Sequence, residues 1–462
     1  MSTDRRPGAL EADAAEAAAE LLPAGVREMS IDDALQLAVR LHQQNRLEGA
    51  RTLYRRILDA VPGHADAMCL LGMVEHQMGR SEQGLKLIRA AIERVPGFVG
   101  FHINLGNVLV EMNRLDDALD AYRRAVEIDP GSADTHNNIG AVHRALGRFD
   151  EARASYERAI AIDGRHVRAW NNLGLLHDVQ GHLEEAMRAY LTAIELVPDS
   201  GMSAYLLGMT FYKLGQIAKA GEVFRQWMLR DPQDPVPAHL HAACSGQGVP
   251  ERASDAYVEA EFDRFAGSFE RVLNERLHYR APQLACDLLA AQLPPPAKAL
   301  EVLDAGCGTG LCGPLVAPWA RRLVGVDLSA GMLAKARTKG VYDELVKAEL
   351  TAFLRDGPAA WDAIVCADTL CYFGDLSAVM RAAAGSLRPG GVLVFTVEAL
   401  ADDLADRAVI LPNGRYAHGR AHLDRVLAEA GLATLAARRD VLRDEAGAPV
   451  NGWLLAVQRP AA

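Results

Sequence analysis

Three glycines at alternate positions follow an acid at the end of a short hydrophobic run. The stretch reads Glu301-Val-Leu-Asp304-Ala-Gly306-Cys-Gly308-Thr-Gly310. It is typical of a buried strand that turns tightly into a helix, because glycine permits positive φ and lets a ligand approach the backbone closely. The first turn of the following helix offers N–H groups that have no partner within the helix. The turn therefore predicts a ligand site of the nucleotide-binding kind.

Two more acids follow the next two predicted strands. Asp327 ends a predicted strand at 322–327 and lies 21 positions after Gly306 (327 − 306). At that distance a carboxylate is placed to accept hydrogen bonds from both hydroxyls of a ribose. Glu349 follows a predicted strand at 344–348.

The elements that must position these residues alternate between short Val/Leu-rich runs and helical stretches. This alternation predicts a parallel sheet with helices on both faces. The last two predicted strands follow one another through Asp444-Glu-Ala-Gly447, as the strands of an antiparallel hairpin do. The predicted strands are 300–304, 322–327, 344–348, 362–367, 391–397, 433–441 and 452–458.

Two further motifs lie at the fourth and fifth predicted strands. Asp368 and Tyr372 follow the fourth predicted strand, and Leu387-Arg-Pro389-Gly390-Gly391 precedes the fifth. With the glycine turn, Asp327 and Glu349, these motifs make residues 284–462 resemble the class I S-adenosylmethionine-dependent methyltransferases. The resemblance implies an α/β, Rossmann-like, seven-stranded methyltransferase domain with S-adenosyl-L-methionine as cofactor.

A dinucleotide-binding oxidoreductase is the rival interpretation of the same turn. Its fingerprint needs glycine or alanine where Leu311 stands. Asp327 fits both folds, whereas Glu349, the Pro-Gly-Gly turn and the terminal hairpin fit only the methyltransferase.

The resemblance also implies roles for the cofactor residues. The glycine turn would hold the methionine end of the cofactor, and Asp304 would accept a hydrogen bond from its amine. Asp327 would bind the ribose, Leu328 and Leu350 would flank the adenine, and Glu349 would bind its amino group. The predicted cofactor-binding residues are Asp304, Ala305, Gly306, Cys307, Gly308, Asp327, Leu328, Glu349 and Leu350.

Three residues are candidates for a catalytic base, which is needed if the acceptor atom must lose a proton. They are Asp368, Tyr372 and His418. Each has a purely structural alternative: Asp368 as a helix cap, Tyr372 as a wall of the site and His418 as a surface histidine. The Asn/Asp-Pro-Pro-Tyr signature of enzymes that methylate exocyclic amino groups is absent, which disfavours adenine and cytosine in nucleic acid as acceptors.

The first half of the chain is an internal repeat of 34 residues. Six units run from Ile31 to Asp234. Every unit except the first has a glycine at the eighth place, and every unit except the second has an aromatic ring at the twenty-fourth. The pattern resembles the tetratricopeptide repeat (TPR), in which small residues let two helices cross closely and the aromatic ring packs into the next unit. The glycines are Gly72, Gly106, Gly140, Gly174 and Gly208, and the aromatic residues are Tyr54, Tyr122, Tyr156, Tyr190 and Phe224.

Asparagine recurs at the sixth place of three successive units, as Asn104, Asn138 and Asn172. An amide side chain carries both a donor and an acceptor, so a row of them can pair with successive peptide groups. The row resembles the asparagine ladder in the repeats of O-linked N-acetylglucosamine transferases, which implies a protein or peptide partner in the groove of a TPR superhelix. The alternative is a solvated polar face of the helices.

The junction between the halves lies within residues 235–283. Phe262-Asp-Arg-Phe-Ala-Gly-Ser-Phe269 belongs to an aromatic stripe of helical spacing that reaches Leu273. Such a stripe is either core or, as small methyltransferases commonly have, a helical lid over the cofactor. This motif and the later Gly414-Arg-Tyr416-Ala-His418 resemble a bacterial group that fuses TPR units to a methyltransferase.

Composition narrows the function classes. A net charge of -11 disfavours a nucleic-acid partner, and the odd set of seven cysteines contains no paired CxxC ligands, so no metal site is predicted. Acidic residues interrupt residues 1–30, which we interpret as a flexible tail, and no apolar run is long enough to span a membrane. These features predict a cytoplasmic protein.

Three functions follow from this organisation. The first is an active methyltransferase whose repeats recruit a protein substrate or partner. The second is a scaffold that binds the cofactor without turnover, and the third is a small-molecule methyltransferase whose repeats mediate assembly. The sequence leaves the acceptor, the partner and the oligomeric state open.

Overall fold

The chain forms two compact units in the computed structural model, which describes residues 29–265, 278–445 and 448–461. The first unit ends at Pro198, and the second begins at Asp199. The sequence placed the end of the repeats at Asp234. The sixth repeat therefore belongs to the second compact unit. Most of the predicted tail, and Phe269 and Leu273 of the predicted aromatic stripe, lie outside the described residues.

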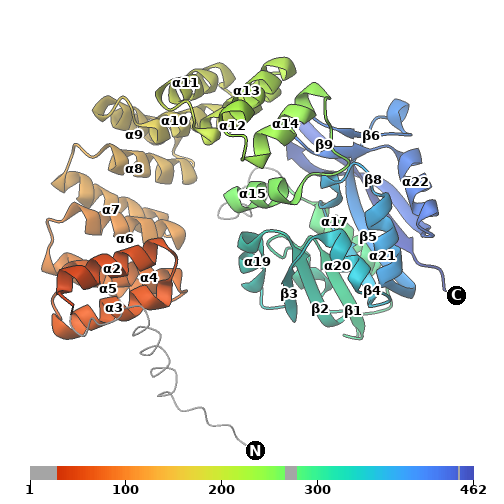
Figure 1. The fold of residues 1–462 in the computed structure, drawn as a ribbon, viewed down its shortest axis with the longest axis horizontal. Helices are drawn as coiled ribbons and strands as arrows, with labels where there is room; N and C mark the ends of the chain where they lie inside the picture. The colour runs from red at the N-terminus through yellow and green to blue at the C-terminus, as the bar shows by residue number, and fades with distance from the viewer. Residues whose placement is uncertain (1–28, 266–277, 446–447, 462) are drawn as a thin grey trace, which may run out of the picture. The chain divides into compact units, whose positions relative to one another are not determined.

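The first unit consists of helix pairs, one pair for each repeat, as the sequence predicts (Figure 1). Each first helix has 13 residues and each second helix has 14, so the helices keep the 34-residue period. The pairs are α2 (Ile31–Gln43) with α3 (Leu47–Ala60), α4 (Ala65–Gln77) with α5 (Ser81–Arg94), α6 (Val99–Glu111) with α7 (Leu115–Ile128), α8 (Ala133–Ala145) with α9 (Phe149–Ile162), and α10 (Val167–Val179) with α11 (Leu183–Leu196).

The repeated glycine receives the aromatic ring of its own repeat. A Cβ atom on Gly140 would lie 2.6 Å from the Tyr156 ring, and one on Gly174 would lie 2.4 Å from the Tyr190 ring. Any side chain there would therefore push the two helices of a pair apart. The ring also packs into the next unit, as the sequence predicted: Tyr156 shares a hydrophobic cluster with Leu173 and Leu176 of the following repeat.

The fourth place of the repeat also has a structural role. His102 Nε2 lies 2.9 Å from the carbonyl oxygen of Pro96, and His136 Nε2 lies 3.2 Å from that of Pro130. Trp170 donates the equivalent bond to Gly164 across 3.0 Å. These side chains form hydrogen bonds with a backbone carbonyl oxygen of the preceding turn, so they have a structural role.

The second unit begins with the sixth repeat, α12 (Gly201–Lys213) and α13 (Ile217–Arg230), on which α14 (Pro235–Ser245) packs. Helix α15 (Asp255–Phe265) contacts α14, and α17 (Ala281–Ala290) packs on the sheet. The remaining described helices are α18 (Gly313–Val316), α19 (Ala330–Arg337), α20 (Leu350–Asp356), α21 (Ser377–Ser386) and α22 (Arg420–Glu429), with short 3-10 turns at Leu370–Tyr372 and Asp402–Leu404.

A nine-stranded sheet forms the core of the described part of this unit (Figure 1). Its main path is β3-β2-β1-β4-β5, all parallel, and β9 then pairs antiparallel with both β5 and β8. The strands are β1 (Leu300–Ala305), β2 (Ala320–Asp327), β3 (Glu344–Lys347), β4 (Trp361–Cys366), β5 (Leu387–Ala399), β6 (Ala408–Ile410), β7 (Tyr416–His418), β8 (Ala433–Glu445) and β9 (Ala448–Gln458). The predicted class I methyltransferase fold, with its antiparallel terminal hairpin, is confirmed.

Both faces of the central strands are buried. Val302, Ala363 and Val394 belong to one hydrophobic cluster with residues of α17. Their neighbours Leu303 and Ile364 point to the opposite face and are also buried. The near-continuous apolar runs of the sequence follow from this double coverage.

The short hairpin of β6 and β7 was not predicted. It extends the sheet beyond the end of β5, where Glu398 and Ala399 pair with Ala417 and His418. Three residues are too few for a periodic signal, so only the Gly414-Arg-Tyr416 element marked this region in the sequence. The hairpin positions Arg415 at the site described below.

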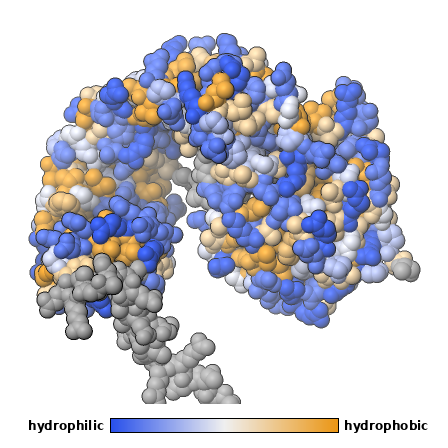
Figure 2. Space-filling model, viewed as in Figure 1, coloured by the Kyte–Doolittle hydropathy of each residue, from blue (hydrophilic) through white to orange (hydrophobic). Residues whose placement is uncertain are grey.

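The visible surfaces of both units are mainly hydrophilic, with smaller hydrophobic areas between (Figure 2). Among the described residues, no helix combines the length and apolar character that crossing a membrane requires. All seven cysteines lie in described segments and carry free thiols.

Candidate functional site

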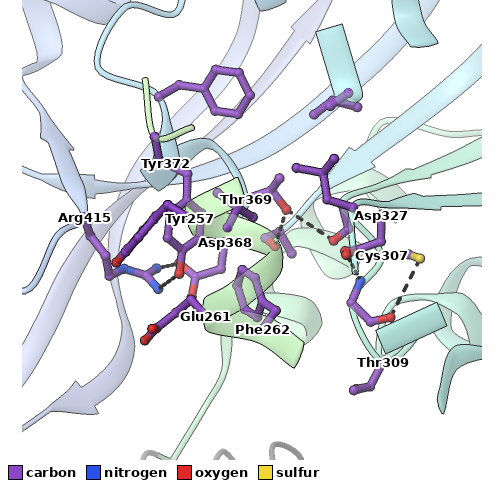
Figure 3. Close-up of a pocket in the computed structure, with 18 of the residues that line it drawn as sticks. Tyr257, Glu261, Phe262, Cys307, Thr309, Asp327, Asp368, Thr369, Tyr372 and Arg415 are labelled. Carbon is purple, nitrogen blue, oxygen red and sulfur yellow. Dashed lines mark hydrogen bonds and ion pairs between the residues drawn. The ribbon is translucent and has the colours of Figure 1, made fainter. Parts of the chain in front are cut away.

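A cavity of about 390 Å³ opens at the carboxyl ends of β1, β2 and β4. Its lining comes from the glycine turn, from helices α12, α15 and α17, and from the segments around Arg415 and Arg443. In Figure 3, Asp327, Cys307 and Thr309 lie on one side of the cavity, the Arg415–Asp368 pair lies on the other, and Phe262 of α15 lies between them. The cavity lies entirely within the second unit.

The glycine turn folds back onto the end of β2. The backbone N–H groups of Gly306 and Cys307 both donate to the carbonyl oxygen of Val326, at 2.8 and 2.9 Å. Gly306 has a φ of +72°, and a Cβ atom there would lie 2.2 Å from Thr369 Oγ1. Gly308 has a φ of +53° and nothing within 4 Å of its Cβ direction, so a ligand can approach its backbone.

Asp327 lines the cavity at the end of β2. Its carboxylate accepts hydrogen bonds from the backbone N–H of Gly308 and of Ser329, each at 2.9 Å. Burial raises the pKa of Asp327, against the opposing effect of these two N–H groups. Each carboxylate oxygen keeps acceptor capacity for a further donor.

Three more predicted cofactor residues line the same wall: Leu328, Glu349 and Leu350. Glu349 caps α20, because its two carboxylate oxygens accept from the N–H groups of Thr351 and Ala352 at 2.9 and 2.8 Å. This capping orients the carboxylate at the edge of the cavity. Seven of the nine predicted cofactor residues are thus brought together by the fold.

Asp304 and Ala305 are not among the residues that line the cavity. Asp304 is 1% exposed, and its carboxyl accepts a 2.6 Å hydrogen bond from the Tyr342 hydroxyl. Burial raises the pKa of Asp304 to about 7, although the Tyr342 hydroxyl opposes that rise. The partner of the Asp304 carboxyl is thus Tyr342, away from the cavity lining.

Thr309 and Thr369 were not predicted as site residues, although both lie within the motifs. Thr309 Oγ1 is buried and has no hydrogen-bond partner among the described residues, yet Thr309 lines the cavity. Thr369 Oγ1 lies within 3.4 Å of the carbonyl oxygens of Ala305, Gly306 and Ala367, and its hydroxyl can donate to one of them at a time. These contacts tie the β4 loop to the glycine turn. An unsatisfied buried hydroxyl such as that of Thr309 suits a polar ligand group.

The far end of the cavity holds a cluster of paired charges. Asp368, which has a φ of +56°, binds Arg415 Nη2 and lies 3.6 Å from Arg443 Nη1. Arg415 also binds Glu398, and Arg443 binds Glu398 at 2.7 Å and Glu445 at 2.8 Å. Of this cluster, the sequence predicted Asp368 alone. Arg415 and Arg443 lie 47 and 75 residues further along the chain (415 − 368 and 443 − 368), where spacing carries no signal.

Of the other two catalytic candidates, only Tyr372 lines the cavity. Its hydroxyl lies 3.4 Å from Arg415 Nη1, and burial raises the pKa of that hydroxyl. His418 is not at the surface and is not part of the cavity lining: it is 0% exposed in β7 and stacks on His422. Burial lowers the pKa of His418 to about 4.

Helix α15 lies over the cavity and is held by polar contacts. Tyr257, Val258, Glu261 and Phe262 line the cavity. Asp263 accepts a hydrogen bond from the hydroxyl of Ser329, the N-cap residue of α19, and Glu259 pairs with Lys347 of β3. The part of the predicted lid that the structure describes therefore lies between the predicted cofactor residues and the charged cluster.

The asparagines of the first unit differ in their partners. Asn172 Nδ2 donates to Asn137 Oδ1 of the preceding repeat at 2.8 Å, and Asn104 Nδ2 lies 3.4 Å from Cys69 Sγ. Both partners are 35 residues earlier, and the equivalent position for Asn138 is the apolar Ile103. Asn138 is half-buried, and within the described part of the chain its amide makes no such inter-repeat bond. Within the described segments, no cluster of His, Cys, Asp and Glu is suited to hold a metal ion.

The raised pKa of Asp304 predicts a pH-dependent stability. The carboxyl of an unfolded chain titrates near about 3.9, so between about pH 4 and 7 the unfolded state loses its proton while the folded state keeps it. The stability that Asp304 contributes is complete below that range and is lost as the pH rises through about 7. Raising the pH from 5 to 8 should therefore cost the wild type about 2 to 3 kcal/mol of unfolding free energy more than it costs Asp304→Asn.

Urea denaturation of both proteins at the two pH values measures this difference. Asp356→Asn, which changes an exposed aspartate of α20, is the matched control and should keep the pH slope of the wild type. Equal slopes for the wild type and Asp304→Asn would contradict the prediction.

Comparisons with known proteins agree with this geometry. Residues 276–439 match the family model described as "Methyltransferase domain". Residues 106–147 match a model described as "TPR repeat", and residues 35–80, 131–199 and 178–235 match tetratricopeptide-repeat models.

Individual relatives cover parts of the chain. Methyltransferase-like protein 27 of Homo sapiens is 40% identical over 111 residues, which are 24% of this chain and 42% of that protein. The ubiquinone biosynthesis O-methyltransferase of Xylella fastidiosa (strain 9a5c) is 28% identical over 152 residues, 31% of this chain and 61% of that protein. The chain spans less than two thirds of the length of these relatives.

Among solved structures, a thermophilic TPR protein in Thermus thermophilus, TTC0263, is 25% identical with a TM-score of 0.36. The match covers 40% of this chain and 100% of that one. The family models and the sheet topology identify the chain as tetratricopeptide repeats joined to a methyltransferase domain of the class I fold.

Proposed function

We propose that the second unit transfers the methyl group of S-adenosylmethionine to an acceptor bound at the α12 and α15 end of the cavity. The observation that carries this proposal is the convergence of the glycine turn, Asp327 and Glu349 on one wall, with Asp368 and Tyr372 on the other. The residues suit the cofactor, because Gly308 leaves its backbone open to a ligand and the buried Thr309 hydroxyl lacks a partner among the described residues.

The cofactor supplies a methyl group on a positively charged sulfur, ready for in-line displacement. The chain then has to hold, orient and shield the reactants. The glycine turn and Thr309 would hold the amino-acid end, Asp327 the ribose, and Glu349 with Leu328 and Leu350 the adenine. Helix α15 would act as the lid that excludes water.

Asp368 is the catalytic candidate that we retain. Its carboxylate lines the cavity beside Tyr372 and is held in place by ion pairs with Arg415 and Arg443. A carboxylate at this position can accept a proton or a hydrogen bond from the acceptor. Tyr372 contributes to the wall and orients Arg415. His418 has no role in this proposal because it does not line the cavity.

For the first unit we propose that the repeats bind a protein or peptide partner. Asn138 is the asparagine of the row whose amide makes no inter-repeat bond to the residues that the structure describes, whereas Asn172 and Asn104 have such partners. A second candidate function is methylation of a small molecule, with the repeats used for assembly. The similarity to an enzyme named as a ubiquinone biosynthesis O-methyltransferase favours it.

Incubation of the full chain with methyl-labelled S-adenosylmethionine and an extract of the source cells separates these functions. Label in the protein fraction supports a protein acceptor, and label in the low-mass fraction supports a small molecule. Tight cofactor binding with no label in either fraction would support a scaffold and overturn the proposed transfer.

Asp327→Asn should weaken binding of S-adenosylhomocysteine at least about tenfold, because hydrogen bonds from the ribose to a charged carboxylate are replaced by weaker ones. Titration calorimetry measures the affinity. Asp356→Asn is again the matched control and should bind like the wild type. Unchanged affinity in Asp327→Asn would show that the ribose assignment is wrong.

Asp368→Asn should slow methyl transfer to the labelled extract fraction roughly a hundredfold or more, because an amide cannot accept the acceptor's proton. Affinity for S-adenosylhomocysteine should stay within about twofold of the wild type, since Asp368 lies outside the predicted cofactor wall. A normal transfer rate would remove Asp368 from the mechanism.

Asn138→Ala combined with Asn172→Ala should lower retention of a random-peptide library on the immobilised full chain by about fivefold, the loss expected for roughly 1 kcal/mol of hydrogen bonding. Glu195→Ala, an exposed change on α11, is the control. Cofactor affinity should not change in either variant. Equal retention by the double variant and the control would reject the ladder.

A further inference from the structure

The sixth repeat contributes directly to the methyltransferase cavity. Tyr205 and Met209, one helical turn apart on α12, both line it together with residues of α15 and α17. Their spacing places them on one face of α12, while Ala204, Leu207 and Phe211 are buried. The first helix of the last repeat therefore also forms a wall of the site.

A hydrogen bond ties this wall to the lid helix. The Tyr205 hydroxyl donates to Glu261 Oε1 across 3.0 Å. Glu261 and Phe262 lie on α15, and Phe262 meets the Tyr372 ring edge-on with centroids 5.5 Å apart. Helix α12, the lid and the β4 loop are thus connected around the end of the cavity that holds Asp368.

This end of the cavity has an aromatic lining. The rings come from α12, α15, the segment before α17 and the β4 loop, and Met209 adds a polarisable thioether. The aromatic residues are Tyr205, Tyr257, Phe262, Tyr279, Tyr372 and Phe373. A flat, largely apolar body fits such a lining.

The positive charges of this end are already compensated by carboxylates. Arg415 binds Asp368 and Glu398, and Arg443 binds Glu398 and Glu445. Glu445 also accepts from Asn413 at 3.0 Å. Three carboxylates face two guanidinium groups in this cluster, so an additional anion would meet a net negative charge. A neutral acceptor with a hydroxyl can instead donate to a carboxylate of the cluster.

We infer that helix α12 of the sixth repeat is a specificity wall of the acceptor subsite, and that the subsite takes a neutral aromatic hydroxyl compound. This inference rests on the proposed methyl transfer, whose acceptor it specifies. Tyr205 holds the lid, and Met209 sets the depth of the subsite.

The test is calorimetry on the full chain saturated with S-adenosylhomocysteine, with catechol as the neutral probe and benzoate as the anionic one. Catechol should bind at least about tenfold more tightly than benzoate, since a single uncompensated charge interaction exceeds roughly 1.4 kcal/mol. Met209→Trp, which fills the subsite, should weaken catechol at least about tenfold while leaving S-adenosylhomocysteine affinity within about twofold. Met202→Trp, an exposed position of the same helix, is the matched control and should change neither affinity.

Each outcome decides one point. Unchanged catechol affinity in Met209→Trp would overturn the role of α12, and preference for benzoate or no binding of catechol by the wild type would overturn the acceptor class. If Met209→Trp fails to fold, as judged by thermal melting, Tyr205→Phe decides: an affinity for catechol about fivefold lower supports the wall, and an unchanged affinity overturns it. Failure of the wild type to bind S-adenosylhomocysteine would instead reject the proposed function on which this inference rests.

Discussion

The hydrogen bonds that fold the glycine turn onto β2 are the constraint on which the cavity depends. Gly306 and Cys307 donate to Val326, and Gly308 donates to Asp327. These bonds hold the end of β1 beside the end of β2, so the turn and the Asp327 carboxylate face the same space. Thr369 then joins the β4 loop to the turn, and that approach is sterically open only because residue 306 has no side chain.

A second constraint acts at the other end of the cavity. Four segments distant in the chain meet in one charged cluster, with Asp368 after β4, Glu398 on β5, Arg415 before β7 and Arg443 on β8. Buried charges require partners of opposite sign, so these segments are held in register with one another. The cluster shapes the end of the cavity and leaves its carboxylates in excess.

The sixth repeat belongs to the repeats by its sequence and to the methyltransferase unit by its packing. The sixth repeat has the same helix lengths and the same glycine-to-ring contact as the others, between Gly208 and Phe224. It nevertheless belongs to the second compact unit, where Tyr205 and Met209 line the cavity. A repeat helix can therefore have two roles. Its repeated positions pack within the repeat, and the side chains on its other face line the cavity.

The sequence by itself determined the helix pairs, the strands of the main sheet and the glycine turn with Asp327 and Glu349. Each of these features can be recognised along the chain itself: the helix pairs from the 34-residue period, the strands from their hydrophobic pattern, and the turn from its glycines. Only the tertiary structure decided which side chains share the cavity. It brought Arg415, Arg443, Tyr205 and Met209 into one lining with Asp368. It also buried Asp304 against Tyr342 and kept His418 out of the lining. Contacts between distant segments depend on sheet order and on the pairing of buried charges, and neither has a signature in residue spacing.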